Sequence, residues 1–157
     1  RALRSDAVDI VKVVADATAS AQVSGPNHPI TLIAPNTEVF TLGDAVRIHQ
    51  VVANLLTNAR THTPNGTPIA VMITSNDQEV SISVADQGPG MSEEDQKRIF
   101  ERFYRADSSR ARTGEDGTGL GLSIVHAVMQ AHGGSVSVES ELGKGSKFTL
   151  TFPRKES

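Results

Sequence analysis

One predicted helix carries two asparagines at a spacing that suits a metal site. On a helical wheel at about 100° per residue, Asn54 and Asn58 lie one turn apart on a polar stripe between Arg47 and Thr61. An amide oxygen is a neutral, hard ligand that suits Mg²⁺ together with phosphate oxygens and water. The alternative for so short a pattern is that both amides are solvated or cap local backbone.

A carboxylate and two glycines follow a predicted strand in the segment Asp86-Gln87-Gly88-Pro89-Gly90. Two glycines this close let the backbone turn sharply and approach a flat ligand. A carboxylate beside them can accept a hydrogen bond from an exocyclic amine, such as the N6 amine of adenine. An ordinary Asp-x-Gly turn is the alternative, because this pattern is common in loops.

A third group of residues opens a predicted helix with the run Gly117-Thr118-Gly119-Leu120-Gly121-Leu122. The free N–H groups and the dipole at a helix start attract anions such as phosphate. The spacing differs from the dinucleotide-binding pattern, and no Lys follows as it does in a P-loop. The run therefore indicates a phosphate site of another kind. A flexible linker is the alternative, although linkers seldom alternate Gly with Leu.

The composition restricts the classes of protein that could carry these groups. The chain has 157 residues, a length typical of one domain. The absence of Cys excludes disulfide scaffolds, thiolate zinc sites and cysteine nucleophiles. The net charge of −3 gives no reason to expect nucleic acid as a partner. Six of the 15 Lys and Arg residues fall between Lys97 and Arg112, which favours a small anionic ligand.

Apolar periodicity predicts the elements that must position these residues. Helical spacing predicts long helices at 9–21, 44–61 and 120–132, with Asp44 as an N-cap. A short helix begins after Ser92, and we expect Phe100 and Phe103 to pack partly into the core. Alternation predicts strands at 30–34, 38–42, 68–74, 80–84, 136–139 and 147–152. Residues 105–117 are predicted to form a mobile lid, because the central stretch is polar and has no apolar period.

The strands follow one another in adjacent hairpins, so we expect a mixed, mostly antiparallel sheet. Three long helices must then cover one face of that sheet. The predicted fold class is an α/β two-layer sandwich. It forms a single domain over residues 1–157, with its core at about 8–153.

Together these segments resemble the catalytic ATP-binding (HATPase_c) domain of sensor histidine kinases. This is a branch of the GHKL superfamily, which has the Bergerat fold and includes DNA gyrase, the Hsp90 chaperones and MutL. The matching segments, in order, are the N box at 44–59, the G1 box at 86–90, the F box at 99–105, the G2 box at 117–122 and a last glycine box at 143–148. The run from Asn58 to Pro64 is similar to actinobacterial kinases of the PhoR type.

The resemblance implies ATP and Mg²⁺ as ligands and assigns roles by position in each box. Asp86 would bind adenine N6, Asn58 would ligate Mg²⁺, and Asn54 would lie beside the phosphates. Arg105 would contact the γ-phosphate, where charge builds during transfer. The other residues implied at the nucleotide are His62, Gly88, Gly90, Tyr104, Gly117, Thr118, Gly119, Leu120, Gly121, Leu122 and Ser146, the last through water.

Two positions bear on the reaction. ATP-hydrolysing relatives have a water-activating Glu where this chain has Asn54, and an amide cannot act as that base. The resemblance therefore implies a kinase that holds ATP until an acceptor arrives, with Asn54 and Arg105 as its catalytic residues. The family usually has Lys-Tyr where this chain has Thr61-His62. Arg60, or Arg110 and Arg112 in the lid, could supply the missing charge.

The acceptor of the phosphoryl group is expected outside this chain. None of the five histidines has the His-Glu/Asp-Leu-Arg context of a phosphoacceptor. The resemblance therefore implies a separate dimerisation helix in a homodimeric membrane sensor, with this domain in the cytoplasm, monomeric when isolated. A response regulator would then receive the phosphoryl group. The alternatives are a non-catalytic ATP-sensing module, which Thr61 favours, and an anti-sigma-factor-like serine kinase, which the full F box disfavours.

Overall fold

A five-stranded sheet forms one layer of the molecule in the computed structural model, which describes residues 3–104 and 120–156. The strands lie in the order β2-β4-β5-β7-β6. Their bounds are Ile30–Ile33 for β2, Ile69–Ser75 for β4, Glu79–Asp86 for β5, Gly145–Pro153 for β7 and Ser135–Glu141 for β6. Strand β2 pairs with β4 in parallel, and the other neighbours are antiparallel. The prediction of a mixed, mostly antiparallel sheet is confirmed.

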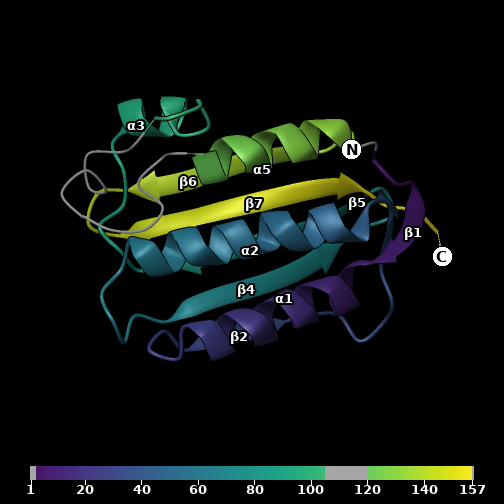
Figure 1. Cartoon of the computed structure of the whole chain (residues 1–157), viewed down its shortest axis with the longest axis horizontal. Helices are drawn as coiled ribbons and strands as arrows, with labels where there is room; N and C mark the ends of the chain where they lie inside the picture. The colour runs from purple at the N-terminus through teal and green to yellow at the C-terminus, as the bar shows by residue number, and fades with distance from the viewer. Residues whose placement is uncertain (1–2, 105–119, 157) are drawn as a thin grey trace.

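Three long helices cover one face of this sheet (Figure 1). They are α1 (Ile10–Ser24), α2 (Ala45–Thr61) and α5 (Leu120–Ala131), and α2 lies between the other two. The apolar stripe of α2 is buried in full, at Ile48, Val51, Val52, Leu55, Leu56 and Ala59. The two-layer sandwich is therefore confirmed, and the core lies between its layers. No helix in the described ranges is long and apolar enough to cross a membrane.

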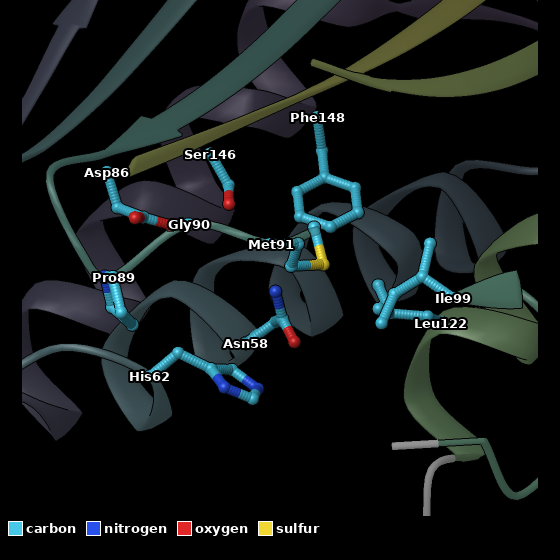
Figure 2. Close-up of a pocket in the computed structure, with 10 residues that line it drawn as sticks. All are labelled: Asn58, His62, Asp86, Pro89, Gly90, Met91, Ile99, Leu122, Ser146 and Phe148. Carbon is cyan, nitrogen blue, oxygen red and sulfur yellow. The ribbon is translucent and has the colours of Figure 1, made fainter. Parts of the chain in front are cut away.

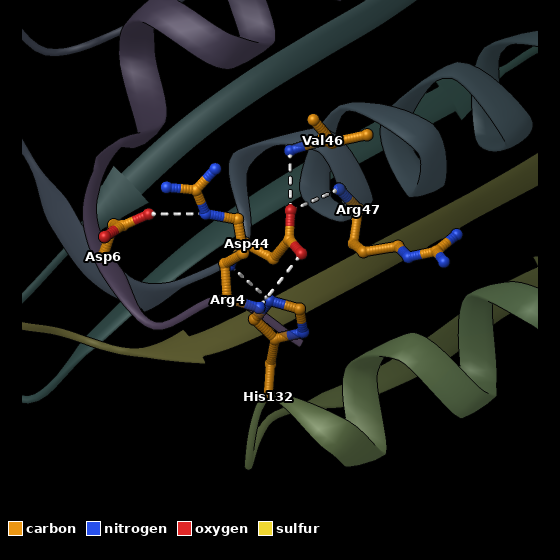
Figure 3. Close-up of polar contacts among 6 residues, drawn as sticks. All are labelled: Arg4, Asp6, Asp44, Val46, Arg47 and His132. Atoms are coloured by element: carbon orange, nitrogen blue, oxygen red, sulfur yellow. Dashed lines mark hydrogen bonds and ion pairs between the residues drawn. The ribbon is translucent and has the colours of Figure 1, made fainter. Parts of the chain in front are cut away.

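A buried polar network fixes the start of α2 (Figure 3). As predicted, Asp44 is the N-cap, and its carboxylate accepts hydrogen bonds from the N–H groups of Arg4, Val46 and Arg47. The Asp44 N–H itself donates to Nε2 of His132 over 3.1 Å. Nδ1 of the same ring lies 2.9 Å from the Val128 carbonyl oxygen. Because Nε2 accepts, the ring is neutral with its proton on Nδ1, and it ties the start of α2 to the end of α5.

One strand pairing differs from the expected hairpin. Strand β3 (Phe40–Gly43) does not pair with β2 but lies antiparallel to β1 (Asp6–Asp9), in a separate two-stranded sheet. The connection after β2 contains Pro35, which has no N–H to donate to a ladder. Strand β1 was not predicted, because only Val8 of its four residues is buried and it shows no alternation.

The short helix α3 (Glu93–Arg98) begins at Ser92, whose hydroxyl caps it by accepting from the Asp95 N–H. Phe100 packs against the core as expected, with its ring 6.1 Å from that of Phe148. The prediction for Phe103 is wrong, since its side chain is 59% exposed. The helix ends at Arg98, so Phe103 does not lie on a helical face, and its own φ is 67°. The lid predicted at 105–117 lies outside the described residues.

Candidate functional site

A pocket lies where the end of α2, the loop after β5 and the start of α5 meet (Figure 2). It opens to solvent, and its empty volume, counted together with the open solvent at its mouth, is about 360 Å³. Its lining residues are Asn58, His62, Asp86, Pro89, Gly90, Met91, Ile99, Leu122, Ser146 and Phe148. Polar groups thus stand on two sides of a mostly apolar space.

One polar side is formed by Asp86 and Ser146. They are direct partners in the register of β5 and β7, so their side chains enter the pocket together (Figure 2). The Gly88 N–H donates to Oδ1 of Asp86 over 2.9 Å. This bond fixes the orientation of the carboxylate at the strand end.

Ser146 presents a second acceptor because of its neighbour Ser140. The Ser140 hydroxyl donates to the Gly145 carbonyl oxygen and accepts from the Met91 N–H. Its oxygen lies 2.9 Å from that of Ser146. Since the single proton of Ser140 is already used, Ser146 is the donor in this pair. The lone pairs of Ser146 are then available to accept, so this wall of the pocket suits a ligand that donates hydrogen bonds.

Burial of the Asp86 side chain raises the pKa of its carboxyl above the ordinary value. Loss of hydration disfavours the charged form, and the N–H groups of Gly88 and Ser146 offset part of this effect. The carboxylate therefore gains more from an incoming donor than an exposed one would.

This environment predicts how the Asp86 pKa responds to ligand. In the free protein the pKa is expected above that of an exposed Asp, and ADP is expected to lower it, because an amine donor stabilises the charged form. By linkage, ADP then binds more weakly as the pH falls through the pKa of the Asp86 carboxyl. Carbon-detected NMR titration of the Asp86 carboxyl, assigned with an Asp86→Asn variant, measures both values. A pKa that ADP leaves unchanged would contradict the predicted contact between Asp86 and the N6 amine of adenine.

The second polar side belongs to α2. Asn58 and His62 are one turn apart and reach the pocket opposite Asp86 (Figure 2). One turn earlier, Nδ2 of Asn54 donates to the Gly121 carbonyl oxygen over 3.3 Å. The two amides predicted to share a stripe therefore do so, and Asn54 connects that stripe to the first turn of α5.

Close backbone packing shapes the loop after β5. Gly90 has φ of 74°, and a Cβ there would lie 2.1 Å from the Glu141 carbonyl oxygen. A Cβ on Gly145 would lie 2.1 Å from the carbonyl oxygen of Asp86 itself. Neither position can hold a side chain without moving the chain. The sequence predicts glycine at residue 90 for the close approach of a ligand, whereas the structure requires it for this contact with the β6–β7 turn.

Asn54 and Gly121 are bonded to each other, and Leu120 begins α5. The structure places the other predicted residues in three groups. Those that line the pocket are Asn58, His62, Asp86, Gly90, Leu122 and Ser146, with Gly88 directly behind Asp86. Tyr104 is not among them: its hydroxyl donates to the buried Asp95, and the Arg98 guanidinium lies 4.6 Å from the centre of its ring. Outside the described residues lie Arg105, Gly117, Thr118 and Gly119, together with Arg110 and Arg112.

Arg60 does not stand in for the missing lysine. Its Nη1 donates to the Ala21 carbonyl oxygen at the end of α1, over 3.2 Å. Its stem covers Gly25, where an added Cβ would lie 2.3 Å from Arg60 Cδ. A cation at a helix C-terminus is favourable there. Arg60 therefore joins α1 to α2, away from Asn54 and Asn58.

Sequence reasoning missed the apolar walls of the pocket, which come from Pro89, Met91, Ile99 and Phe148. Phe148 could have been found, because it lies two residues after Ser146 on β7 and so shares its face of the strand. It also missed Ser140, since the sequence does not show which serine on β6 faces Ser146.

Comparison with known proteins agrees with this geometry. Residues 43–156 match the family model described as histidine kinase-, DNA gyrase B-, and HSP90-like ATPase. The chain is 42% identical, over 98% of its length, to the probable sensor histidine kinase TcrY of Mycobacterium tuberculosis, of which it covers 32%. It is 41% identical, over 94% of its length, to the sensor-like histidine kinase SenX3 of Mycolicibacterium smegmatis, of which it covers 38%. The chain thus spans about a third of the length of these relatives.

Solved structures show the same fold. The mycobacterial sensor histidine kinase MprB superimposes with a TM-score of 0.85 and 26% identity, over 97% of this chain and 100% of that one. Full-length ShkA, solved in complex with AMPPNP, gives a TM-score of 0.81 and 29% identity over 100% of this chain and 32% of that one. From the family model, this chain belongs to the histidine kinase-, DNA gyrase B- and HSP90-like ATPase family, and it is similar over nearly its whole length to parts of sensor histidine kinases.

Proposed function

We propose that this chain binds ATP with Mg²⁺ and donates the γ-phosphate to a histidine on a separate dimerisation helix. The observation that carries the proposal is the half-buried carboxylate of Asp86, oriented by the Gly88 N–H at the edge of an apolar pocket. A carboxylate held in this way selects a flat ligand with an exocyclic amine. Adenine fits these requirements.

The pocket divides naturally into a base end and a phosphate end. At the base end, Asp86 accepts from the N6 amine, Ser146 accepts through water, and Met91, Ile99 and Phe148 flank the ring. At the other end, we assign the Asn58 amide as a ligand of Mg²⁺, with His62 beside the nucleotide. An amide oxygen fits this ion, because phosphate oxygens and water complete its ligand set. The ion, when bound, neutralises charge on the phosphates.

The position of Asn54 supports a kinase over a hydrolase. Its amide is bonded to Gly121 in the first turn of α5, within the run of glycines that we assign to the phosphates. An amide cannot take a proton from water, so bound ATP is protected from hydrolysis. We assign Arg105 and residues 117–122 to the phosphate end on their positions in the F and G2 boxes. Of these, Arg105 would stabilise charge on the γ-phosphate as it transfers.

The wider context is part of the same proposal. The relatives are named as sensor kinases, and full-length ShkA was solved with an ATP analogue. We therefore place this chain as the single catalytic domain, over residues 1–157, of a homodimeric membrane sensor. It faces the cytoplasm, where ATP is present and where the phosphoacceptor helices and a response regulator complete the relay.

Phosphotransfer in trans tests the proposal. The domain, labelled ATP and Mg²⁺ are mixed with a histidine-containing helix bundle from the parent gene, and the product is treated with acid. We expect acid-labile label on the bundle with the native domain and none with an Asp86→Ala variant. ATP binding without any transfer would contradict the kinase proposal. It would support an ATP-sensing module, which the absence of a lysine at Thr61 and the remote position of Arg60 favour.

A further inference from the structure

A buried histidine stands behind the base end of the pocket, at the start of the parallel edge strand. The side chain of His28 is 4% exposed and precedes β2. Its Nε2 lies 3.2 Å from the main-chain carbonyl oxygen of Thr63. A protonated Nε2 donates to that oxygen, and Thr63 follows His62 at the end of α2. The ring therefore fixes the point at which the chain leaves α2.

Thr63 in turn packs against the loop that orients Asp86. Its side chain is buried, and its hydroxyl donates to the Ala59 carbonyl oxygen over 2.8 Å. This bond aims the methyl group at the neighbouring loop, where a Cβ on Gly88 would lie 2.8 Å from Thr63 Cγ2. Gly88 is the residue whose N–H holds Oδ1 of Asp86. A continuous line of contacts therefore runs from His28 through Thr63 and Gly88 to the carboxylate.

The loop that carries His28 is itself held firmly. Nε2 of Gln22 donates to the His28 carbonyl oxygen over 2.9 Å, and Oε1 of Gln22 accepts from the Ile30 N–H over 2.8 Å. The Gly66 N–H donates to the Asn27 carbonyl oxygen over 2.6 Å. The loop before β2 and the loop after α2 are thus joined at Asn27 as well as through the His28 ring. Such an anchored donor can restrain the position of Thr63.

We propose that His28, acting through Thr63, is a positioning residue for the base-recognising carboxylate of Asp86. The inference rests on the proposed function, since the ligand that benefits is an adenine nucleotide. His28 does not line the pocket, and its line of contacts through Thr63 and Gly88 ends at the carboxylate that we assign to the base. Losing the restraint should weaken the binding of ATP and of ADP by the same factor.

Three variants and a control separate positioning from general stability. His28→Leu removes the donor, His28→Gln keeps an Nε2 donor at a similar reach, and Thr63→Ser removes only the methyl that packs on Gly88. Val14→Ala, in the buried face of α1, provides a loss of stability far from these contacts. Dissociation constants for ATP and ADP are measured by calorimetry well below each melting temperature.

Because one hydrogen bond is lost, His28→Leu is expected to weaken the binding of both nucleotides by about three- to tenfold. Thr63→Ser is expected to weaken both by about two- to threefold, since one methyl contact is lost. His28→Gln and Val14→Ala are expected to bind like the native protein. The positioning role is wrong if His28→Leu binds both nucleotides normally. It is also wrong if Val14→Ala loses as much stability as His28→Leu and weakens nucleotide binding by as large a factor.

A measurement without nucleotide keeps this inference separate from the proposed function. In ¹H–¹⁵N spectra of the free protein, His28→Leu is expected to shift the Gly88 amide and speed its hydrogen exchange, whereas His28→Gln restores both. If the native protein fails to bind ATP but the Gly88 amide responds in this way, the proposed function fails and the positioning role remains. An unchanged Gly88 amide in His28→Leu would overturn the inference.

Discussion

Replacing Asp86 by Ala is expected to weaken ATP binding by about 100-fold while changing the melting temperature little. The carboxylate is the acceptor we assign to the exocyclic amine, and without it that donor is buried in an apolar pocket with no partner. Folding loses less, because burial already disfavours the charged form of this group and raises its pKa. The bond from the Gly88 N–H is the main native interaction that the variant gives up.

The matched control for this experiment is Asp16→Ala. It removes the same charge from a side chain on α1 that is 74% exposed and pairs with His49 on the surface. Calorimetric titration with ATP and thermal unfolding without nucleotide are run on both variants. If Asp86→Ala binds ATP within threefold of the native protein, the assignment of the base-recognising residue is wrong. A large fall in its melting temperature would instead indicate that the carboxylate is chiefly a structural group.

The parts of the fold that could be predicted from sequence are those in which local pattern and tertiary packing agree. The apolar stripe of α2 is one, because helical periodicity and burial select the same residues. The hairpin of β4 and β5 is another, since both strands alternate. The partner of β2 could not be predicted in this way. Its four residues fit either a hairpin with β3 or a parallel pairing with β4, and the choice depends on where α2 crosses the sheet.

The site shows the same division. Asp86 and Asn58 could be identified because each occupies a recognisable local position, one at a strand end and one on a helical stripe. The roles of Arg60 and Tyr104 depend on distant contacts with Ala21 and Asp95. The direction of a long side chain is set by partners that the sequence places far away or around a turn. Spacing alone therefore left Arg60 and the lid arginines as alternatives to the family lysine, whereas the contacts of Arg60 assign it to the end of α1.

Two glycines in the β6–β7 turn provide the second large prediction, because they have similar backbones and different surroundings. Gly143 has φ of 83° and Gly145 has φ of 92°. A Cβ on Gly143 would meet nothing within 4 Å, whereas a Cβ on Gly145 would lie 2.1 Å from the Asp86 carbonyl oxygen. An Ala at either position is destabilised by the left-handed backbone, by about 1–2 kcal/mol. At residue 145 it also forces β7 away from β5.

Gly145→Ala is therefore expected to lower the free energy of unfolding by about 2–4 kcal/mol more than Gly143→Ala. Because the collision is with Asp86, whose register partner is Ser146, the variant should also lose ATP affinity at temperatures where it is still folded. Urea unfolding and calorimetric titration measure the two effects, with Gly143→Ala as the control for backbone strain. Equal losses of stability in the two variants would mean that strain, and not the contact with Asp86, requires glycine at residue 145. If Gly145→Ala is less stable but binds ATP normally, the strand pair can separate at this end without moving the carboxylate, and the close packing behind Asp86 would serve folding alone.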